Sequence, residues 1–127
     1  MQHKLIRKAR VFNQLKEKLK DLTILVEGKR DVKALMIAGI GEGKSIIAMN
    51  SQKMEIIARK LSGRKVAILT DYDRTGELKA REAYEELLSF GAYPDLECRR
   101  TLKCVLGLYR IEEIKQRYGI SKRNSQM

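Results

Sequence analysis

Three acidic residues each follow a short apolar run in this 127-residue chain. Their carboxylates are the side chains best suited to bind a metal ion or to transfer a proton. Glu27 follows the run 22–26, and Asp71 and Asp73 follow the run 66–69. Residues two apart in an extended segment point to the same side, so both aspartates are expected to face one site. Carboxylates brought together repel one another, and an oxygen-preferring cation such as Mg²⁺ or Mn²⁺ removes that repulsion. The spacing therefore predicts a metal centre.

The same carboxylates have a structural alternative, in which they cap helices or pair with neighbouring cations such as Lys29 and Arg74. Other chemistries find little support in the composition. The chain has one histidine, His3, and two cysteines, Cys98 and Cys104, so neither a zinc ligand set nor a histidine-based catalytic triad is expected.

Apolar periodicity predicts the elements that must position these acids. Helical spacing covers residues 4–20, 31–38, 52–62, 76–90 and 111–118, and strand-like runs cover 22–26, 46–49, 66–69 and, weakly, 96–100. This alternation predicts an α/β fold with a central, mostly parallel sheet of about four strands flanked by helices. Ligands of such sheets bind at the carboxyl ends of the strands. If the first and third strands are neighbours, the three acids meet at one edge.

The residues around these acids resemble the two sequence motifs of the Toprim domain. Residues 22–31 (LTILVEGKRD) are similar to the first motif, and residues 66–76 (VAILTDYDRTG) are similar to the second. The motifs occur in order, each with a predicted strand. The chain looks most like the small stand-alone Toprim proteins of archaea and the ribonuclease that matures 5S rRNA. The resemblance covers about residues 20–100 and implies the Toprim, Rossmann-like fold.

The resemblance also implies a role for each matching residue. Glu27 would be a metal ligand and the catalytic acid or base, and Asp71 and Asp73 would hold Mg²⁺, with Mn²⁺ as a substitute and two ions expected. Asp31 either joins a second metal site or only opens the following helix through a favourable contact with the helix dipole. The residues expected to bind phosphate oxygens are Lys29, Arg74 and Lys79.

Positive charge, +11 in total, is concentrated at the two ends of the chain. Residues 1–20 carry seven Lys/Arg and one acid, residues 99–127 carry eight and two, and the middle carries twelve and thirteen. Two basic flanks around an acidic site suit a phosphate-rich partner such as RNA or DNA. The expected organisation is a basic amphipathic helix at 1–20, a Toprim domain at 21–101, and a basic helix with a polar tail at 102–127.

The chain is expected to be cytoplasmic, because it has neither a signal-like apolar stretch nor the roughly 20 apolar residues that cross a bilayer. The expected function is a Mg²⁺-dependent nuclease or RNA/DNA-processing factor that acts on phosphodiesters. The alternative is a non-catalytic accessory module that binds nucleic acid and uses the same metal as a clamp. A topoisomerase is disfavoured, because that class usually carries a third acid where this chain has Thr75.

A competing motif lies at residues 38–45 (AGIGEGKS), which satisfy a relaxed P-loop pattern. A P-loop must follow a strand and open a helix, so that backbone N–H groups meet the phosphates. The predicted order here is the reverse, a helix, a loop and then a strand. The rival interpretation makes residues 34–38 a strand and 45–61 one long helix, and it would indicate a nucleotide hydrolase.

Overall fold

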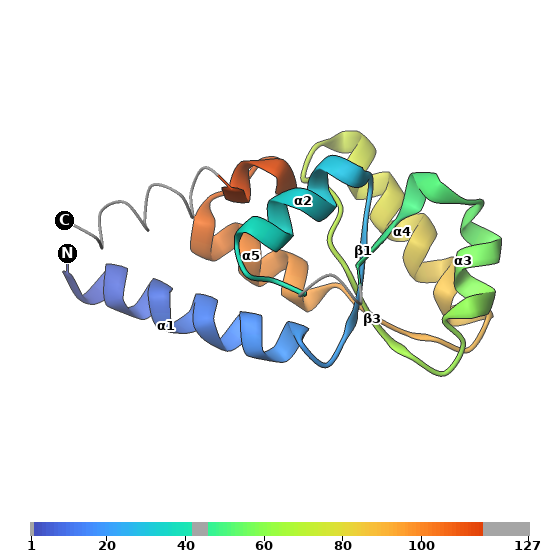
Figure 1. The fold of residues 1–127 in the computed structure, drawn as a ribbon, viewed down its shortest axis with the longest axis horizontal. Helices are drawn as coiled ribbons and strands as arrows, with labels where there is room; N and C mark the ends of the chain where they lie inside the picture. The colour runs from blue at the N-terminus through green and yellow to red at the C-terminus, as the bar shows by residue number, and fades with distance from the viewer. Residues whose placement is uncertain (1, 42–45, 116–127) are drawn as a thin grey trace.

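The computed structural model describes residues 2–41 and 46–115, and it contains one sheet of four parallel strands (Figure 1). The strand order is β2-β1-β3-β4. The strands are β1 (Thr23–Val26), β2 (Ile46–Ala48), β3 (Lys65–Ile68) and β4 (Tyr93–Asp95). The helices are α1 (Gln2–Leu19), α2 (Lys29–Ile37), α3 (Met54–Lys60), α4 (Arg74–Ser89) and α5 (Glu97–Leu106), with 3₁₀ turns η1 (Met49–Ser51) and η2 (Ile111–Glu113). The predicted α/β architecture is confirmed.

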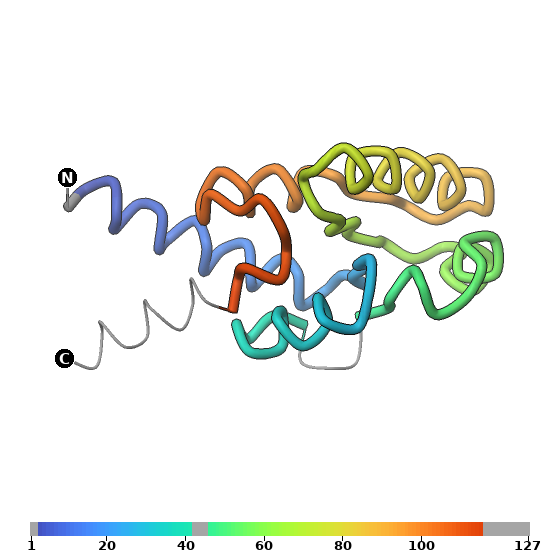
Figure 2. The backbone as a smooth tube through the Cα atoms, turned by 90° about the horizontal axis from the view of Figure 1, so that it is seen from above, coloured from blue at the N-terminus to red at the C-terminus, as the bar shows by residue number. Residues whose placement is uncertain are grey.

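Helices cover both faces of the sheet, because successive strand residues point apolar side chains to opposite sides. On one face, Ile24 and Ala67 pack with residues of α1, α2 and α5. On the other face, Leu25, Val66 and Ile68 pack with residues of α3 and α4. Figures 1 and 2 show these two groups of helices on either side of the strands.

The first and third strands are neighbours, as the placement of the acids requires. Their register aligns Ile24 with Ala67 and Leu25 with Ile68, and the N–H of Leu69 continues the pairing by donating to the Leu25 carbonyl at 2.8 Å. The two strands therefore end at the same level of the sheet. The segments that follow them, beginning with Glu27 and leading to Asp71, meet at that edge.

The strand predicted at 96–100 is wrong. The strand lies earlier, at Tyr93–Asp95, and α5 begins at Glu97. The Asp95 carboxylate accepts a hydrogen bond from the N–H of Cys98 at 3.0 Å, which satisfies a backbone donor of the first turn and starts a helix there. Helix α5 also crosses the domain boundary predicted between residues 101 and 102. The predicted last helix begins as η2, and its residues from 116 onward lie outside the described part.

The elements on either side of residues 38–45 are a helix and then a strand, the reverse of the order that a P-loop needs. Residues 34–37 belong to α2 and 46–48 to β2, so the rival interpretation of a strand followed by one long helix is wrong. Gly39 and Gly41 adopt positive φ angles of 75° and 77°, a region that favours glycine. Lys44 and Ser45 lie outside the described residues.

Helix α1 is anchored at its carboxyl-terminal half. Leu15 and Leu19 are buried in the core, whereas residues 3–10 are all exposed. This half of the helix packs beside α5 (Figure 2). Within the described residues, no helix combines the length and apolar character needed to span a bilayer.

The loop between β3 and α4 closes tightly on one glycine. A Cβ atom at Gly76 would lie 2.0 Å from the backbone oxygen of Asp71. The Thr70 hydroxyl donates to the Gly76 carbonyl at 2.8 Å, and the Asp73 carboxylate accepts from the Gly76 N–H at 2.7 Å. Only glycine therefore fits at position 76, because any side chain there would clash with the backbone of Asp71.

We expect Gly76→Ala to lower the free energy of unfolding by about 3 kcal/mol, because the added methyl group meets backbone that cannot yield. The matched control is Gly63→Ala, where the space is open but the φ angle of +79° is unfavourable for alanine. Its expected cost is about 1 kcal/mol. Urea unfolding of both variants measures the difference, and equal costs would show that the loop relaxes around the methyl group.

Candidate functional site

Glu27 lies at the centre of the edge where β1 and β3 end. Its Oε2 accepts a hydrogen bond from the N–H of Asp71 at 2.8 Å, and its Oε1 lies 3.2 Å from the Nζ of Lys79 on α4. The side chain of Glu27 is 14% exposed. Its carboxylate is thus held from two sides, and it links the ends of two strands to α4.

Asp71 sits beside Glu27 and carries the clearest electrostatic perturbation of the site. Burial raises the pKa of Asp71 to about 6, although a hydrogen bond of 2.7 Å from the N–H of Ile111 to its Oδ1 acts in the opposite direction. The carboxylate of Glu27, through hydrogen bonding and charge, and the charge of Asp31 raise this pKa further. The fold therefore gathers negative charge that it does not itself fully compensate.

Asp31 is buried in the first turn of α2, where its Oδ2 accepts a hydrogen bond from the N–H of Gly28 at 3.1 Å. Burial raises the pKa of Asp31, and the charges of Glu27 and Glu112 act in the same direction. The structure shows the helix-opening contact expected for this residue. A role for Asp31 in a second metal site stays a prediction.

Asp73 is placed differently from the other acids. It is the N-cap residue of α4, where its carboxylate accepts from the N–H of Gly76 at 2.7 Å. It is absent from the lining of the pocket at the strand ends, whereas Glu27, Asp31 and Asp71 all line it. The structural alternative for these acids, helix capping, thus describes the observed contact of Asp73.

The carboxylates open onto a pocket of about 450 Å³ at the carboxyl edge of the sheet. Of the expected phosphate-binding residues, the pocket brings in Lys29 and Lys79 but not Arg74, which is exposed at the start of α4. The lining residues are Glu27, Gly28, Lys29, Arg30, Asp31, Asn50, Asp71, Lys79 and Glu112.

Three polar residues of this pocket, Arg30, Asn50 and Glu112, were not expected from the sequence. Asn50 follows β2, and its N–H donates to the backbone oxygen of Glu27 at 3.2 Å. The criterion that identified Glu27 and Asp71, a polar residue just after a predicted strand, would also have identified Asn50. Glu112 belongs to η2, which reaches the site because the N–H of Ile111 bonds to Asp71. No local pattern predicts that contact.

The donors at this edge are oxygen atoms, the ligands that Mg²⁺ prefers, and Mg²⁺ commonly binds through one or two carboxylates while it keeps several waters. Glu27 and Asp71 match that requirement. In residues 2–41 and 46–115, no group of three or more His, Cys, Asp or Glu side chains is arranged to hold a metal ion. The donor set therefore fits an ion held partly by water or by a substrate, rather than an ion enclosed by protein.

A buried arginine fixes the loop that carries Asp71. The Nε of Arg99 donates to the carbonyl of Thr70 at 3.0 Å, and its Nη2 donates to the carbonyl of Asp71 and lies 2.7 Å from Glu77 Oε1. Its guanidinium stacks 4.5 Å above the ring of Tyr72, whose hydroxyl donates to the Arg99 carbonyl at 2.6 Å. Arg99 belongs to the basic flank in the sequence, but the structure places it inside.

Comparison with known proteins identifies the family. A UPF0292 protein of Thermococcus gammatolerans is 35% identical over 112 residues, which cover 86% of this chain and 82% of that protein. The chain belongs to the UPF0292 family. A second UPF0292 protein, from Methanosarcina barkeri, is 40% identical over 84 residues. No family model matches the chain.

The extent of these matches differs between relatives. The match spans 57% of the Methanosarcina barkeri protein and 60% of a UPF0292 protein from Methanosarcina acetivorans, which is less than two thirds of either. A solved structure of a protein from Aquifex aeolicus has a TM-score of 0.70 and 32% identity, and the match covers 83% of this chain and 95% of that one. This UPF0292 chain and the Aquifex protein therefore share a fold.

The clustered carboxylates predict that Asp71→Asn increases the free energy of unfolding, by an amount that depends on pH. Because the folded-state pKa of about 6 lies above the ordinary value of 3.8, the ionised carboxylate destabilises the parent, which loses stability as the pH rises through this range. The variant should match the parent at about pH 3.5 and exceed it at pH 7 by about 1 kcal/mol, a figure reduced for the partial exposure of the group. Urea unfolding in EDTA measures this, and a variant less stable than its parent at pH 7 would contradict it.

The contacts of Arg99 predict that even a conservative change is costly. Arg99→Lys keeps the charge but loses the planar set of donors that reaches Thr70, Asp71 and Glu77, and we expect a loss of about 2–3 kcal/mol in the free energy of unfolding. The matched control is Arg100→Lys on the same helix, where the side chain is 74% exposed and lies 3.8 Å from Glu97. That change should cost less than about 0.5 kcal/mol. Thermal and urea unfolding compare the two.

Proposed function

We propose that this UPF0292 protein is a Toprim-type, Mg²⁺-binding protein that acts on nucleic-acid phosphodiesters as a nuclease or RNA/DNA-processing factor. The observation that carries the proposal is the meeting of Glu27 and Asp71 where two adjacent parallel strands end, with Asp31 beside them. Buried negative charge gathered in an open pocket is typical of a functional site. The likeness of the two motifs to those of the Toprim domain supports the same assignment.

The pocket also has the cations that a phosphodiester needs. Lys29 and Arg30 are exposed and line it, so both are placed to contact the oxygens of an entering phosphate. Glu27 is the residue proposed to accept or return a proton, and Lys79 holds its carboxylate in position. Bound Mg²⁺ would supply charge stabilisation on the phosphate and lower the pKa of a water molecule.

The partner class follows from charge. The chain carries +11 overall, and three acids of the pocket, Glu27, Asp31 and Asp71, lie in the middle segment, where charges nearly balance. A surface of this sign attracts polyanions over a distance of about one Debye length, roughly 8 Å at physiological salt. A nucleic acid is therefore favoured over a small neutral substrate.

The proposal is tested by incubating the chain with labelled single- and double-stranded RNA and DNA in the presence of Mg²⁺ or Mn²⁺. We expect Glu27→Gln and Asp71→Asn to lower the cleavage rate at least about 100-fold, because each removes a carboxylate that acts in the pocket. The matched control is Glu85→Gln, an exposed residue of α4 outside the pocket, which should retain the parent rate.

Calorimetric titration of Mg²⁺ and Mn²⁺ separates the parts of the proposal. The parent and Glu85→Gln should bind metal alike, and the two pocket variants should bind it at least about tenfold more weakly. Unchanged metal affinity in both pocket variants would remove the metal site. Metal-dependent binding of nucleic acid without cleavage would instead support the accessory module.

A further inference from the structure

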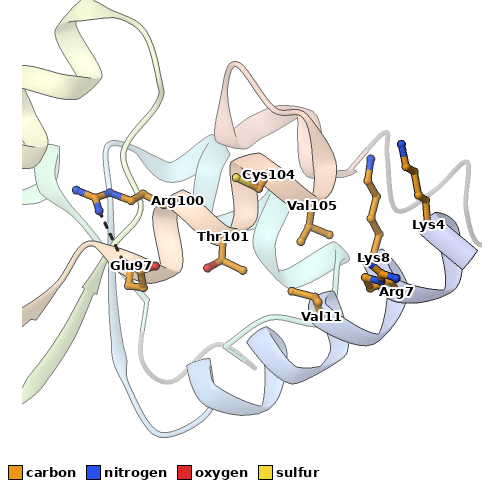
Figure 3. Close-up of a pocket in the computed structure, with 9 residues that line it drawn as sticks. All are labelled: Lys4, Arg7, Lys8, Val11, Glu97, Arg100, Thr101, Cys104 and Val105. Atoms are coloured by element: carbon orange, nitrogen blue, oxygen red, sulfur yellow. Dashed lines mark ion pairs between the residues drawn. The ribbon is translucent and has the colours of Figure 1, made fainter.

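A groove of about 370 Å³ runs between α1 and α5 (Figure 3), and Arg99 is not among the residues that line it. The middle of the groove is formed by small apolar and hydroxyl-bearing side chains, Val11 on α1 and Thr101 and Val105 on α5. None of the residues that line it lines the carboxylate pocket. It is therefore a second concave surface with its own chemistry.

Cations stand at both ends of this groove. Lys4, Arg7 and Lys8 come from the exposed half of α1, and Arg100 comes from the start of α5 (Figure 3). The one acid in the lining, Glu97, lies 3.8 Å from Arg100, and both side chains are about 70% exposed, so this pair contributes little. Within the described part of the chain, the three α1 cations take part in none of the ion pairs.

The arrangement of charge and apolar surface matches one class of ligand. A single strand of nucleic acid presents phosphates at intervals, with sugars and unpaired bases between them, and proteins bind it in basic grooves that follow its backbone. A duplex hides its bases and presents a broad phosphate surface that a groove of this size cannot enclose. We infer that the α1–α5 groove is a metal-independent binding site for single-stranded nucleic acid.

An anionic membrane is the other surface that such cations suit, and the structure favours it less. Helices that lie on membranes bury a continuous apolar face in the lipid. In the exposed half of α1, the large apolar side chains in solvent are Leu5 and Ile6. The cations at the groove also face a hollow between two helices rather than a convex surface.

This inference deepens the proposed function and rests on it, since the groove would hold the nucleic acid on which the carboxylate pocket acts. Helix α5 links the two surfaces, because its Arg99 donates to the carbonyl of Asp71 in the acidic loop and its Arg100 lines the groove. A strand held in the groove is thereby bound to the same rigid element that positions the acidic loop. Binding in the groove itself requires no metal ligand.

The test measures fluorescence anisotropy of labelled single-stranded RNA, single-stranded DNA and their duplexes with the full chain in EDTA, over a series of salt concentrations. Four phosphate contacts predict a slope of log affinity against log salt of about −3 for single strands. In the variant Lys4→Gln, Arg7→Gln, Lys8→Gln, three contacts are lost, so the slope should become shallower by about 2 and the affinity should fall at least about tenfold.

The matched control removes the same charge elsewhere. Lys53, Arg64 and Arg81 are exposed and line neither the groove nor the pocket, and their combined change to Gln should keep the affinity within about threefold of the parent. A second variant, Thr101→Glu, places a negative charge in the middle of the groove and should also weaken binding about tenfold or more. Thermal unfolding establishes that each variant is folded.

Several results would overturn the inference. Equal losses in the two triple variants would mean that total charge, and not the groove, governs binding. A preference for duplexes, or binding to phosphatidylcholine vesicles with 30% phosphatidylserine and not to oligonucleotides, would assign the surface to another partner. Loss of metal-free binding in Asp71→Asn would place the nucleic acid in the carboxylate pocket.

The failure of the groove and the failure of the proposed function are distinguishable. If the parent shows Mg²⁺-dependent cleavage but the Lys4→Gln, Arg7→Gln, Lys8→Gln variant binds single strands as well as the parent does, the groove is not the binding site. The proposed function would remain supported. If the groove variants lose metal-free binding as expected but the parent cleaves no substrate, the binding site in the groove is supported and the nuclease activity is not.

Discussion

Arg99 is 6% exposed, and a buried charge of this kind is costly unless it is paired and hydrogen-bonded. Its acceptors are the carbonyls of Thr70 and Asp71 and the carboxylate of Glu77. All three belong to the loop behind β3 and the first turns of α4. Helix α5 therefore fixes the loop from which the Asp71 carboxylate projects, and the close approach of Gly76 to the same loop leaves that path no freedom.

A rigid loop explains how the fold can hold carboxylates together against their repulsion. The side chain of Asp71 is fixed by the N–H of Ile111, and its own N–H is fixed by Glu27. Lys79 offsets part of the negative charge from the α4 side. Burial and the neighbouring acids still raise the pKa of Asp71, so the folded chain is less stable than it would be with a neutral side chain there. Surplus negative charge held in this way attracts a cation, and it is typical of sites kept for function rather than for stability.

The parts of the fold that could be predicted from the sequence are those that depend on local pattern. The apolar pattern predicted the first three strands and the first four helices. The position of acids after predicted strands placed Glu27 and Asp71 at one edge of the sheet. The region around Asp95 was predicted wrongly because β4 is short and contains Pro94, whereas the helix that follows buries Cys98 and Leu102 only through its packing with other elements. The inward position of Arg99 depends on acceptors 22 to 29 residues away, and no local pattern reports such a contact.

Because Arg99 is buried, it does not contribute to the positive surface of the protein. In the sequence it counts toward a basic carboxyl-terminal flank, but in the fold its side chain is buried, pairs with the exposed Glu77 and donates to two backbone carbonyls. The positive surface beside α5 is therefore supplied mainly by α1, whose exposed residues 3–10 contain no acid. The charged residues that line the groove are thus mainly cations, whereas the pocket combines four carboxylates with three cations, and no residue lines both. Within the described residues, no ion pair joins a groove residue to a pocket residue, so a basic groove and a carboxylate pocket coexist in one small domain.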